Sequence, residues 1–118
     1  MRKLVELALF TDKVAEMTAF YSALLGAQPS YANEMMATFA LGEVKLLIHQ
    51  RLPAAPGDPP NVDHFAFGVE DLAAETQAVA ESGLKFDVGP REFDWGASAY
   101  LHDPDGRLVE MHKPRRYD

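Results

Sequence analysis

The chain has 118 residues, of which 47% are hydrophobic and 25% charged, so it is long enough to fold as one domain with its own core. It contains no cysteine, which excludes disulfide bonds, thiolate metal sites and cysteine nucleophiles and is typical of a reducing compartment. Eighteen acidic residues against eleven basic ones give a net charge of −7, which disfavours nucleic acid as a partner. The N-terminal segment lacks the long apolar run of a signal peptide or membrane span, so we expect a cytoplasmic protein.

The first half of the chain predicts one strand, one helix and three further strands. Residues 6–11 are apolar and flanked by turn-forming residues, which is typical of a strand. Thr11 or Asp12 can cap the helix that follows, and Gly26 ends it. Apolar residues recur at helical spacing along that helix and predict its buried face: Val14, Met17, Phe20, Tyr21, Leu24 and Leu25. Three strands are expected near 27–32, 35–41 and 44–50.

The second half repeats this order after a proline-rich linker. Residues 52–61 hold four of the eight prolines, a density that neither helix nor sheet tolerates, so they separate half 1–51 from half 62–118. We expect a strand at 64–69, a helix capped by Asp71 and ended by Gly83, and strands near 84–88, 97–102 and 107–112. The helix should bury Leu72, Thr76, Val79 and Ala80.

The spacing of the two halves indicates an internal duplication. Position 64 follows position 6 by 58 residues, and Gly83 follows Gly26 by 57. We therefore predict an α+β fold in a single domain, residues 1–118. Two tandem β-α-β-β-β units should form a curved, eight-stranded mixed sheet, a cup or partial barrel with the helices on its outer face.

Strand alternation predicts which side chains line the concave face. His64, Ala66 and Gly68 share one face of their strand, while Phe65, Phe67 and Val69 share the other and belong against the helix. His64 therefore points into the cup. In the last strand, Leu108, Glu110 and His112 share a face, and a carboxylate would be costly against a helix without a partner. Glu110 is thus also expected inside.

Three segments carry a resemblance to a known family. They are Phe20-Tyr21-x-x-Leu24-Leu25-Gly26, His64-Phe65-Ala66-Phe67 and Asp103-Pro104-Asp105-Gly106-Arg107-Leu108-Val109-Glu110. Together they resemble the vicinal oxygen chelate superfamily, which includes glyoxalase I, extradiol dioxygenases, fosfomycin-resistance thiol transferases and bleomycin-resistance proteins. The resemblance covers essentially the whole chain. It implies a cup of paired units, one divalent metal ion on the inner face and a homodimer.

The resemblance also implies four inner-face ligand positions, of which this chain fills three. His64 matches the third and Glu110 the fourth. Counted from Phe20 the first falls on Glu6; counted from Asp12 it falls on Val5, but strand packing favours Glu6. One imidazole and two carboxylates suit Mn²⁺, Fe²⁺, Ni²⁺ or Zn²⁺.

The second ligand position departs from the family. It falls on Leu46, or on Leu47 if the preceding turn is one residue longer, and leucine binds no metal. His49 lies further along the face of Leu47 and is a candidate to reach into the cup.

Residues before the last hairpin offer further contacts for a substrate. Tyr100 and Ser98 share strand parity and are expected to line the cup, with Tyr100 donating a hydrogen bond to a substrate oxyanion. Arg91 either clamps a substrate carboxylate or phosphate or is solvated in a loop. Trp95 either contacts substrate or packs over a turn. Glu6 is either a metal ligand or a general base facing the same space.

Two functions follow from these residues. The first is a metal-dependent lyase, isomerase or transferase that acts on a small oxygenated substrate through metal-stabilised oxyanion chemistry. The second is a metal-free protein, like the bleomycin-resistance group, that sequesters a small molecule. Two carboxylates with one histidine disfavour ring-cleaving dioxygenase chemistry, and the leucine at the second position disfavours glyoxalase I chemistry.

Overall fold

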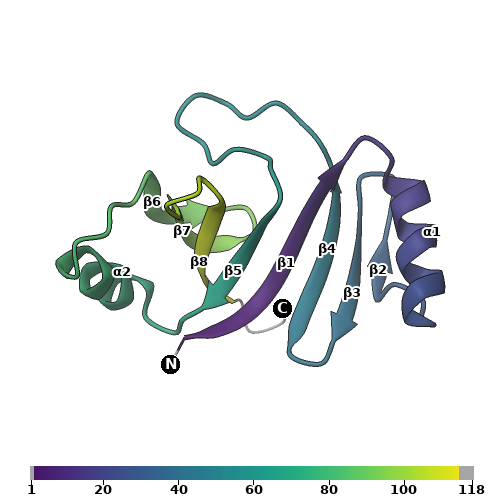
Figure 1. Cartoon of the computed structure of the whole chain (residues 1–118), viewed down its shortest axis with the longest axis horizontal. Helices are drawn as coiled ribbons and strands as arrows, with labels where there is room; N and C mark the ends of the chain where they lie inside the picture. The colour runs from purple at the N-terminus through teal and green to yellow at the C-terminus, as the bar shows by residue number, and fades with distance from the viewer. Residues whose placement is uncertain (1, 115–118) are drawn as a thin grey trace.

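One mixed sheet of eight strands and two helices make up the fold (Figure 1). The computed structural model describes residues 2–114, so residue 1 and residues 115–118, the ends of the predicted halves, lie outside the described residues. The first half comprises β1 (Lys3–Thr11), α1 (Val14–Leu25), β2 (Tyr31–Ala32), β3 (Met36–Leu41) and β4 (Val44–Gln50). The second half comprises β5 (His64–Gly68), α2 (Leu72–Glu81), β6 (Val88–Phe93), β7 (Gly96–His102) and β8 (Leu108–Lys113).

The strand order confirms the tandem arrangement. It runs β2-β3-β4-β1-β5-β8-β7-β6, so the halves meet where β1 pairs with β5 in antiparallel fashion. Each half contains a parallel pair, β1 with β4 and β5 with β8, at the equivalent place. Leu7 pairs with Phe65 in the central pair, and these two residues are 58 positions apart, the offset of the duplication. An approximate two-fold axis therefore passes near this pair.

Each helix buries its own small core against the outer strands of its half. On the first side, α1 packs on β3 and β4 around Val14, Phe39, Leu46 and Ile48, with Leu9, Met17 and Tyr21 beside them. On the second side, α2 covers β6, β7 and β8 around Val69, Leu72 and Met111, with Val79, Phe86 and Ala97 beside them. Within the described residues, neither helix is long and apolar enough to cross a membrane.

The helix ends agree only partly with the sequence signals. Asp71 accepts a hydrogen bond from the Ala74 amide and so caps α2, as predicted. Gly26 ends α1 in the left-handed conformation at φ 65°, which glycine adopts without strain. The prediction that Thr11 or Asp12 caps α1 is wrong: Lys13 precedes the helix without a side-chain cap, because the Thr11 hydroxyl accepts from the Lys13 amide instead.

Two predicted strands are misplaced. The strand expected at 84–88 is wrong, because β6 begins only at Val88 and extends to Phe93. Residues 84–87 instead lead away from α2, and Phe86 packs into the core beneath the helix. A two-residue turn after Phe93, which pairs with Gly96, fixes the position of β6. The strand expected at 27–32 is reduced to Tyr31–Ala32.

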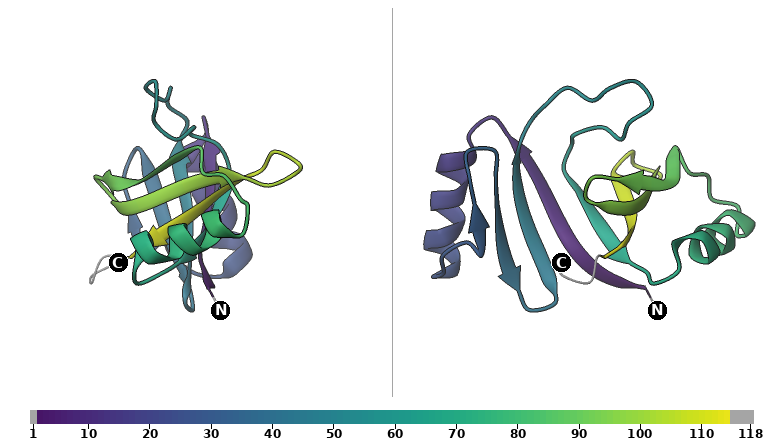
Figure 2. Two further views of the ribbon diagram at one scale, coloured as in Figure 1. Left: turned by 90° about the vertical axis from the view of Figure 1, so that its left-hand side faces the viewer. Right: turned by 180° about the vertical axis from the view of Figure 1, so that it is seen from behind.

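The helices leave the middle of the outer face uncovered. They lie at opposite ends of the sheet, with β1 and β5 between them (Figures 1 and 2). The predicted burial of Phe20 and Leu24 is wrong, since 58% and 66% of their surfaces are exposed. Leu7, which pairs with Phe65 on the outer face, is 37% exposed for the same reason. The sheet thus has a concave inner face and an apolar strip along the centre of its outer face.

Candidate metal centre

Three potential ligands meet on the inner face within one chain. Glu6 comes from β1, His64 from the start of β5 and Glu110 from β8. Strand register explains their proximity: Glu6 and Glu110 both pair with Ala66, one on each side of β5, and its small side chain leaves room between them. One ligand atom from each residue lies within 4.8 Å of the others. No second chain is needed to assemble the cluster.

A bulge in β1 selects Glu6 over Val5 for this cluster. Leu4 pairs with Phe67 and Glu6 with Ala66, so Val5 is an extra residue in β1. The Val5 side chain lies over Gly68: a Cβ placed at Gly68 would come within 2.6 Å of Val5 Cγ1. Only glycine fits there without displacing valine. The bulge therefore directs Glu6 towards His64 and Glu110.

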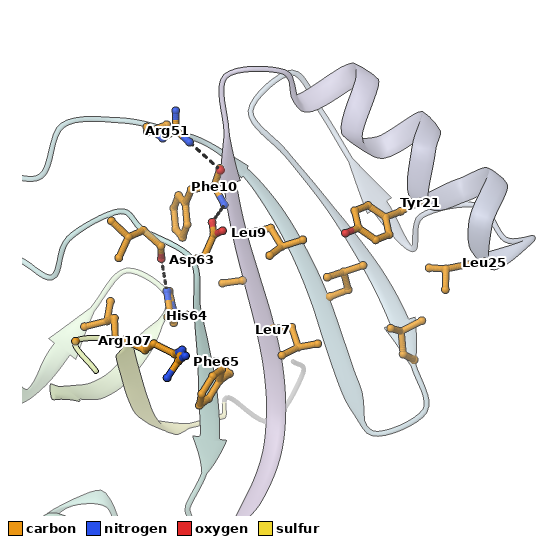
Figure 3. A pocket seen from close by; sticks show the side chains of 16 residues that line it. Leu7, Leu9, Phe10, Tyr21, Leu25, Arg51, Asp63, His64, Phe65 and Arg107 are labelled. Atoms are coloured by element: carbon orange, nitrogen blue, oxygen red, sulfur yellow. Dashed lines mark hydrogen bonds between the residues drawn. The ribbon is translucent and has the colours of Figure 1, made fainter. Parts of the chain in front are cut away.

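Two hydrogen bonds fix the start of β5, where His64 stands (Figure 3). The Asp63 carboxylate accepts from the Phe10 amide at 2.8 Å, tying the start of β5 to the end of β1. The His64 Nδ1 lies 2.8 Å from the Val62 carbonyl, and its Nε2 lies 3.1 Å from Glu110 Oε1. The Val62 carbonyl thus orients the imidazole and leaves Nε2 facing the cluster.

Glu110 is the most enclosed ligand, with 3% of its surface exposed. The Ser98 hydroxyl donates to its Oε2 at 2.6 Å. Burial raises the pKa of the Glu110 carboxyl, but hydrogen bonds from His64 and Ser98 outweigh burial and hold that pKa below its usual value. Burial lowers the pKa of His64, but the hydrogen bonds to Glu110 and Val62 outweigh it and raise that pKa. Without a metal, both shifts favour the charged forms, an imidazolium beside a carboxylate.

Glu6 has a different environment, which includes a lysine that sequence reasoning missed. Lys45 stands beside Glu6 in the β1–β4 register, and its Nζ lies 3.3 Å from Glu6 Oε2. Burial raises the pKa of the Glu6 carboxyl, Lys45 lowers it, and the nearby Glu110 charge raises it; the net shift is upward. Strand parity could have found Lys45, because it shares the face of Leu47 and His49.

Tyr100 and Ser98 lie on β7 facing the cluster, as strand parity predicts. Tyr100 pairs with Glu110 across the β7–β8 ladder and is buried. Burial, reinforced by the charge of Glu110, raises the pKa of Tyr100 far above its usual value, so the phenol keeps its proton and remains a donor. Ser98 is already engaged, since its hydroxyl lies 2.6 Å from Glu110 and 3.0 Å from His112 Nδ1.

The other predicted contact residues lie further from the cluster. His49 is on the inner face, but its Nδ1 lies 2.7 Å from the Gln50 carbonyl, and it is not among the clustered ligands. The Arg91 guanidinium lies 4.6 Å from the centre of the Phe93 ring and forms an ion pair with Asp58 of the linker. Trp95 sits in the β6–β7 turn and stacks on Phe93, with ring centres 4.5 Å apart.

Aromatic rings link these peripheral residues to the cluster. Phe10 lies between His49 and His64, with ring centres 5.6 and 5.9 Å away. On the other side, Tyr100 lies 6.0 Å from both His64 and Phe93. The clustered ligands are therefore flanked by flat, mostly apolar walls, as expected of a site for a small organic molecule.

A family model decides the relationship of this chain to known proteins. The model for the Glyoxalase/Bleomycin resistance protein/Dioxygenase superfamily matches residues 3–111. The chain belongs to this superfamily. No curated protein matches the chain significantly.

Solved structures with this superfamily fold extend over nearly the whole chain. A structure described as NAD-dependent benzaldehyde dehydrogenase from Legionella pneumophila has a TM-score of 0.77 at 17% identity, covering 93% of this chain and 98% of its own. A hypothetical protein from Bacillus halodurans has a TM-score of 0.76 at 21% identity, with 98% and 96% covered. Methylmalonyl-CoA epimerase from Streptomyces coelicolor, in complex with 2-nitronate-propionyl-CoA, has a TM-score of 0.71 at 19% identity, with 97% and 95% covered. At these identities the likeness establishes the fold.

The three clustered residues fit the divalent metal that superfamily membership implies. One imidazole nitrogen and two carboxylates form a donor set for Mn²⁺, Fe²⁺, Ni²⁺ or Zn²⁺. The carbonyl behind His64 and the hydroxyl behind Glu110 orient two of the ligands, as outer partners do in metal sites. Leu47, not Leu46, occupies the inner face next to Ala8, while Leu46 is buried against α1. The protein therefore offers three ligands and no donor atom at Leu47.

Proposed function

We propose that this superfamily member is a metal-dependent enzyme, a lyase, isomerase or transferase, acting on a small oxygenated substrate. The observation that carries the proposal is the convergence of Glu6, His64 and Glu110 within 4.8 Å on the concave face. A divalent ion held there supplies an electrophile that polarises a substrate oxygen. Glu6, His64 and Glu110 would hold the ion, and because Leu47 supplies no donor atom, a coordination position would remain for that oxygen.

The surrounding residues supply the remaining functions. Tyr100 stays protonated and donates a hydrogen bond to oxygen that becomes negative during the reaction. Where Glu6 does not bind the ion, its carboxyl, whose pKa is raised by burial, is suited to exchange a proton with substrate. Arg91 and Trp95 lie at the far end of the aromatic series and contact the distal part of the substrate. The likeness to methylmalonyl-CoA epimerase supports an isomerase among the three reaction types.

Equilibrium binding of Mn²⁺ tests this proposal, using protein prepared without an affinity tag. We expect one ion per chain and loss of binding in His64→Ala. The matched control is His49→Ala, which removes a second inner-face histidine that lies outside the cluster. If both variants bind like the wild type, the proposed centre is wrong.

A specific observation favours metal-free ligand binding as the second function. Within the described residues, no buried side-chain nitrogen or oxygen lacks a hydrogen-bond partner. Lys45 neutralises Glu6, and His64 pairs with Glu110, so the cluster is satisfied by protein groups alone. In this case the protein sequesters its ligand, and the wild type binds no Mn²⁺, Ni²⁺ or Zn²⁺.

We further propose that the chain forms a homodimer through the uncovered strip on its outer face. Leu7, Leu9 and Phe65 border a groove there, with Tyr21 and Leu25 of α1 along one wall (Figure 3). These side chains lie near the approximate two-fold axis of one chain, and a second copy would meet the same apolar surface. Sedimentation equilibrium at micromolar concentration should give twice the chain mass of 13.1 kDa.

A further inference from the structure

The approximate symmetry of the fold shows that the two halves fill equivalent places differently. Glu6 on β1 corresponds to His64 on β5, and each is the start of a parallel pair: Glu6 with Lys45 and His64 with Leu108. Two residues further along, Leu47 corresponds to Glu110. The first half therefore has an apolar side chain at Leu47 where the second half has a carboxylate, and it carries a cation at Lys45. In the second half, the place of Lys45 holds the buried, uncharged Leu108.

Lys45 is placed so that its ammonium can contact a bound ligand in addition to Glu6. Its side chain is 44% exposed, whereas that of Glu6 is 18% exposed, so the ammonium lies on the solvent side of the pair. Within residues 2–114, Glu6 is its only ion-pair partner, at 3.3 Å. A single, partly hydrated contact of this kind is weak. When Glu6 binds a metal ion, the ammonium can therefore turn to an incoming anion without leaving the Glu6 carboxylate unpaired.

The charges of the loaded cluster favour an anionic ligand. The two carboxylates of Glu6 and Glu110 balance a divalent ion, and His64 is neutral when its Nε2 binds metal. The charge of Lys45 is then unbalanced, so the centre has an excess positive charge although the net charge of the chain is −7. Arg91, which the sequence predicted as a substrate contact, already forms an ion pair with Asp58 and lies over the Phe93 ring. Lys45 stands two residues before Leu47 on β4 and shares its face, so it is a cation beside the ligand position that Leu47 leaves without a donor atom.

We propose that Lys45 binds a substrate carboxylate and restricts this site to small 2-hydroxy or 2-oxo carboxylic acids. The oxygen on the second carbon lies at the metal-binding cluster, and the adjacent carboxylate pairs with the ammonium. This inference rests on the proposed metal-dependent function and adds the substrate class. The rival role for Lys45 is to neutralise Glu6 without contacting a ligand.

Lactate and lactamide distinguish these roles, since they share the 2-hydroxyl group and differ in the carboxylate. Binding to Mn²⁺-loaded protein is measured by the fall in water proton relaxation as ligand displaces water from the ion. The wild type should bind lactate more tightly than lactamide, by roughly tenfold as expected of one charge-assisted hydrogen bond. Lys45→Met should abolish that preference and leave lactamide binding unchanged, while Lys45→Arg should retain it.

Lys3→Met is the matched control, because Lys3 forms an exposed ion pair with Glu43 and should not alter either affinity. If Lys45→Met binds Mn²⁺ and keeps the wild-type preference for lactate, the inference is overturned and the proposed metal centre stands. The inference is also overturned, and the metal centre also stands, if the wild type binds Mn²⁺ but binds lactate and lactamide equally. If the wild type binds no Mn²⁺, both the metal centre and this inference fail.

Discussion

Removing a bound divalent ion should lower the melting temperature of this protein, because the unfolded chain lacks the assembled cluster of Glu6, His64 and Glu110. At a free metal concentration one hundred times the dissociation constant, binding stabilises the folded state by about 2.7 kcal/mol. For a chain of 118 residues, 1 kcal/mol changes the melting temperature by about 4 °C. We therefore expect a chelator to lower it by roughly 10 °C.

Substitutions of the metal-binding residues should reduce the effect of chelator on the melting temperature to different extents. His64→Ala should melt at one temperature with or without chelator, because the imidazole nitrogen is lost. Glu110→Gln should retain a small response, because an amide oxygen is a weaker ligand than a carboxylate but still accepts from Ser98. His49→Ala should keep the full response, since its ring bonds the Gln50 carbonyl away from the cluster.

Thermal unfolding followed by circular dichroism measures all four proteins with Mn²⁺ and with chelator. The reasoning is refuted if the untreated wild type contains no metal, binds none when offered Mn²⁺, Ni²⁺ or Zn²⁺, and melts at the same temperature with chelator. The enzyme hypothesis then fails, and metal-free ligand binding replaces it.

Three further predictions concern pH, assembly and the missing ligand. In metal-free protein, the pair of His64 and Glu110 stabilises the fold only while both groups are charged. Because the pKa of His64 is raised from 6.5, this stabilisation is lost as pH rises above 6.5 through the raised pKa. Because the pKa of Glu110 is lowered from 4.5, it is also lost as pH falls below 4.5 through the lowered pKa. The difference in melting temperature between wild type and His64→Gln should therefore be largest between these values. Leu7→Lys should shift the sedimentation mass to that of a monomer, with folding checked by circular dichroism. Leu47→Glu should increase Mn²⁺ affinity by adding an inner-face carboxylate, whereas Leu46→Glu, in the core under α1, should only destabilise the fold.

Much of the fold was predictable because a duplicated chain gives the same local signals twice. Alternation placed His64 and Glu110 on one face, and the structure brings both to the inner face. The position of β6 was not predictable from its own residues, because pairing with β7 and the turn after Phe93 determine it. The exposure of Phe20 and Leu24 is also non-local, since it depends on α1 lying at one end of the sheet.

The candidate site shows the same division between local and non-local information. Glu6 could be favoured over Val5 from packing, but the bulge that directs it inward appears only when β1 pairs with β5. Lys45 was overlooked because its significance comes from standing beside Glu6 on the neighbouring strand. No pattern within residues 44–50 contains that relationship.

The two carboxylates of the cluster, Glu6 and Glu110, have different surroundings and therefore suit different roles. Glu110 is held by His64 and Ser98, and its lowered pKa keeps it ionised, which suits a fixed ligand. Glu6 is paired with Lys45, is more accessible, and has a raised pKa. Two acids whose pKa values are moved in opposite directions are characteristic of a site that transfers protons. In the metal-free protein we therefore expect Glu6 to be the carboxylate that exchanges a proton, while Glu110 stays ionised.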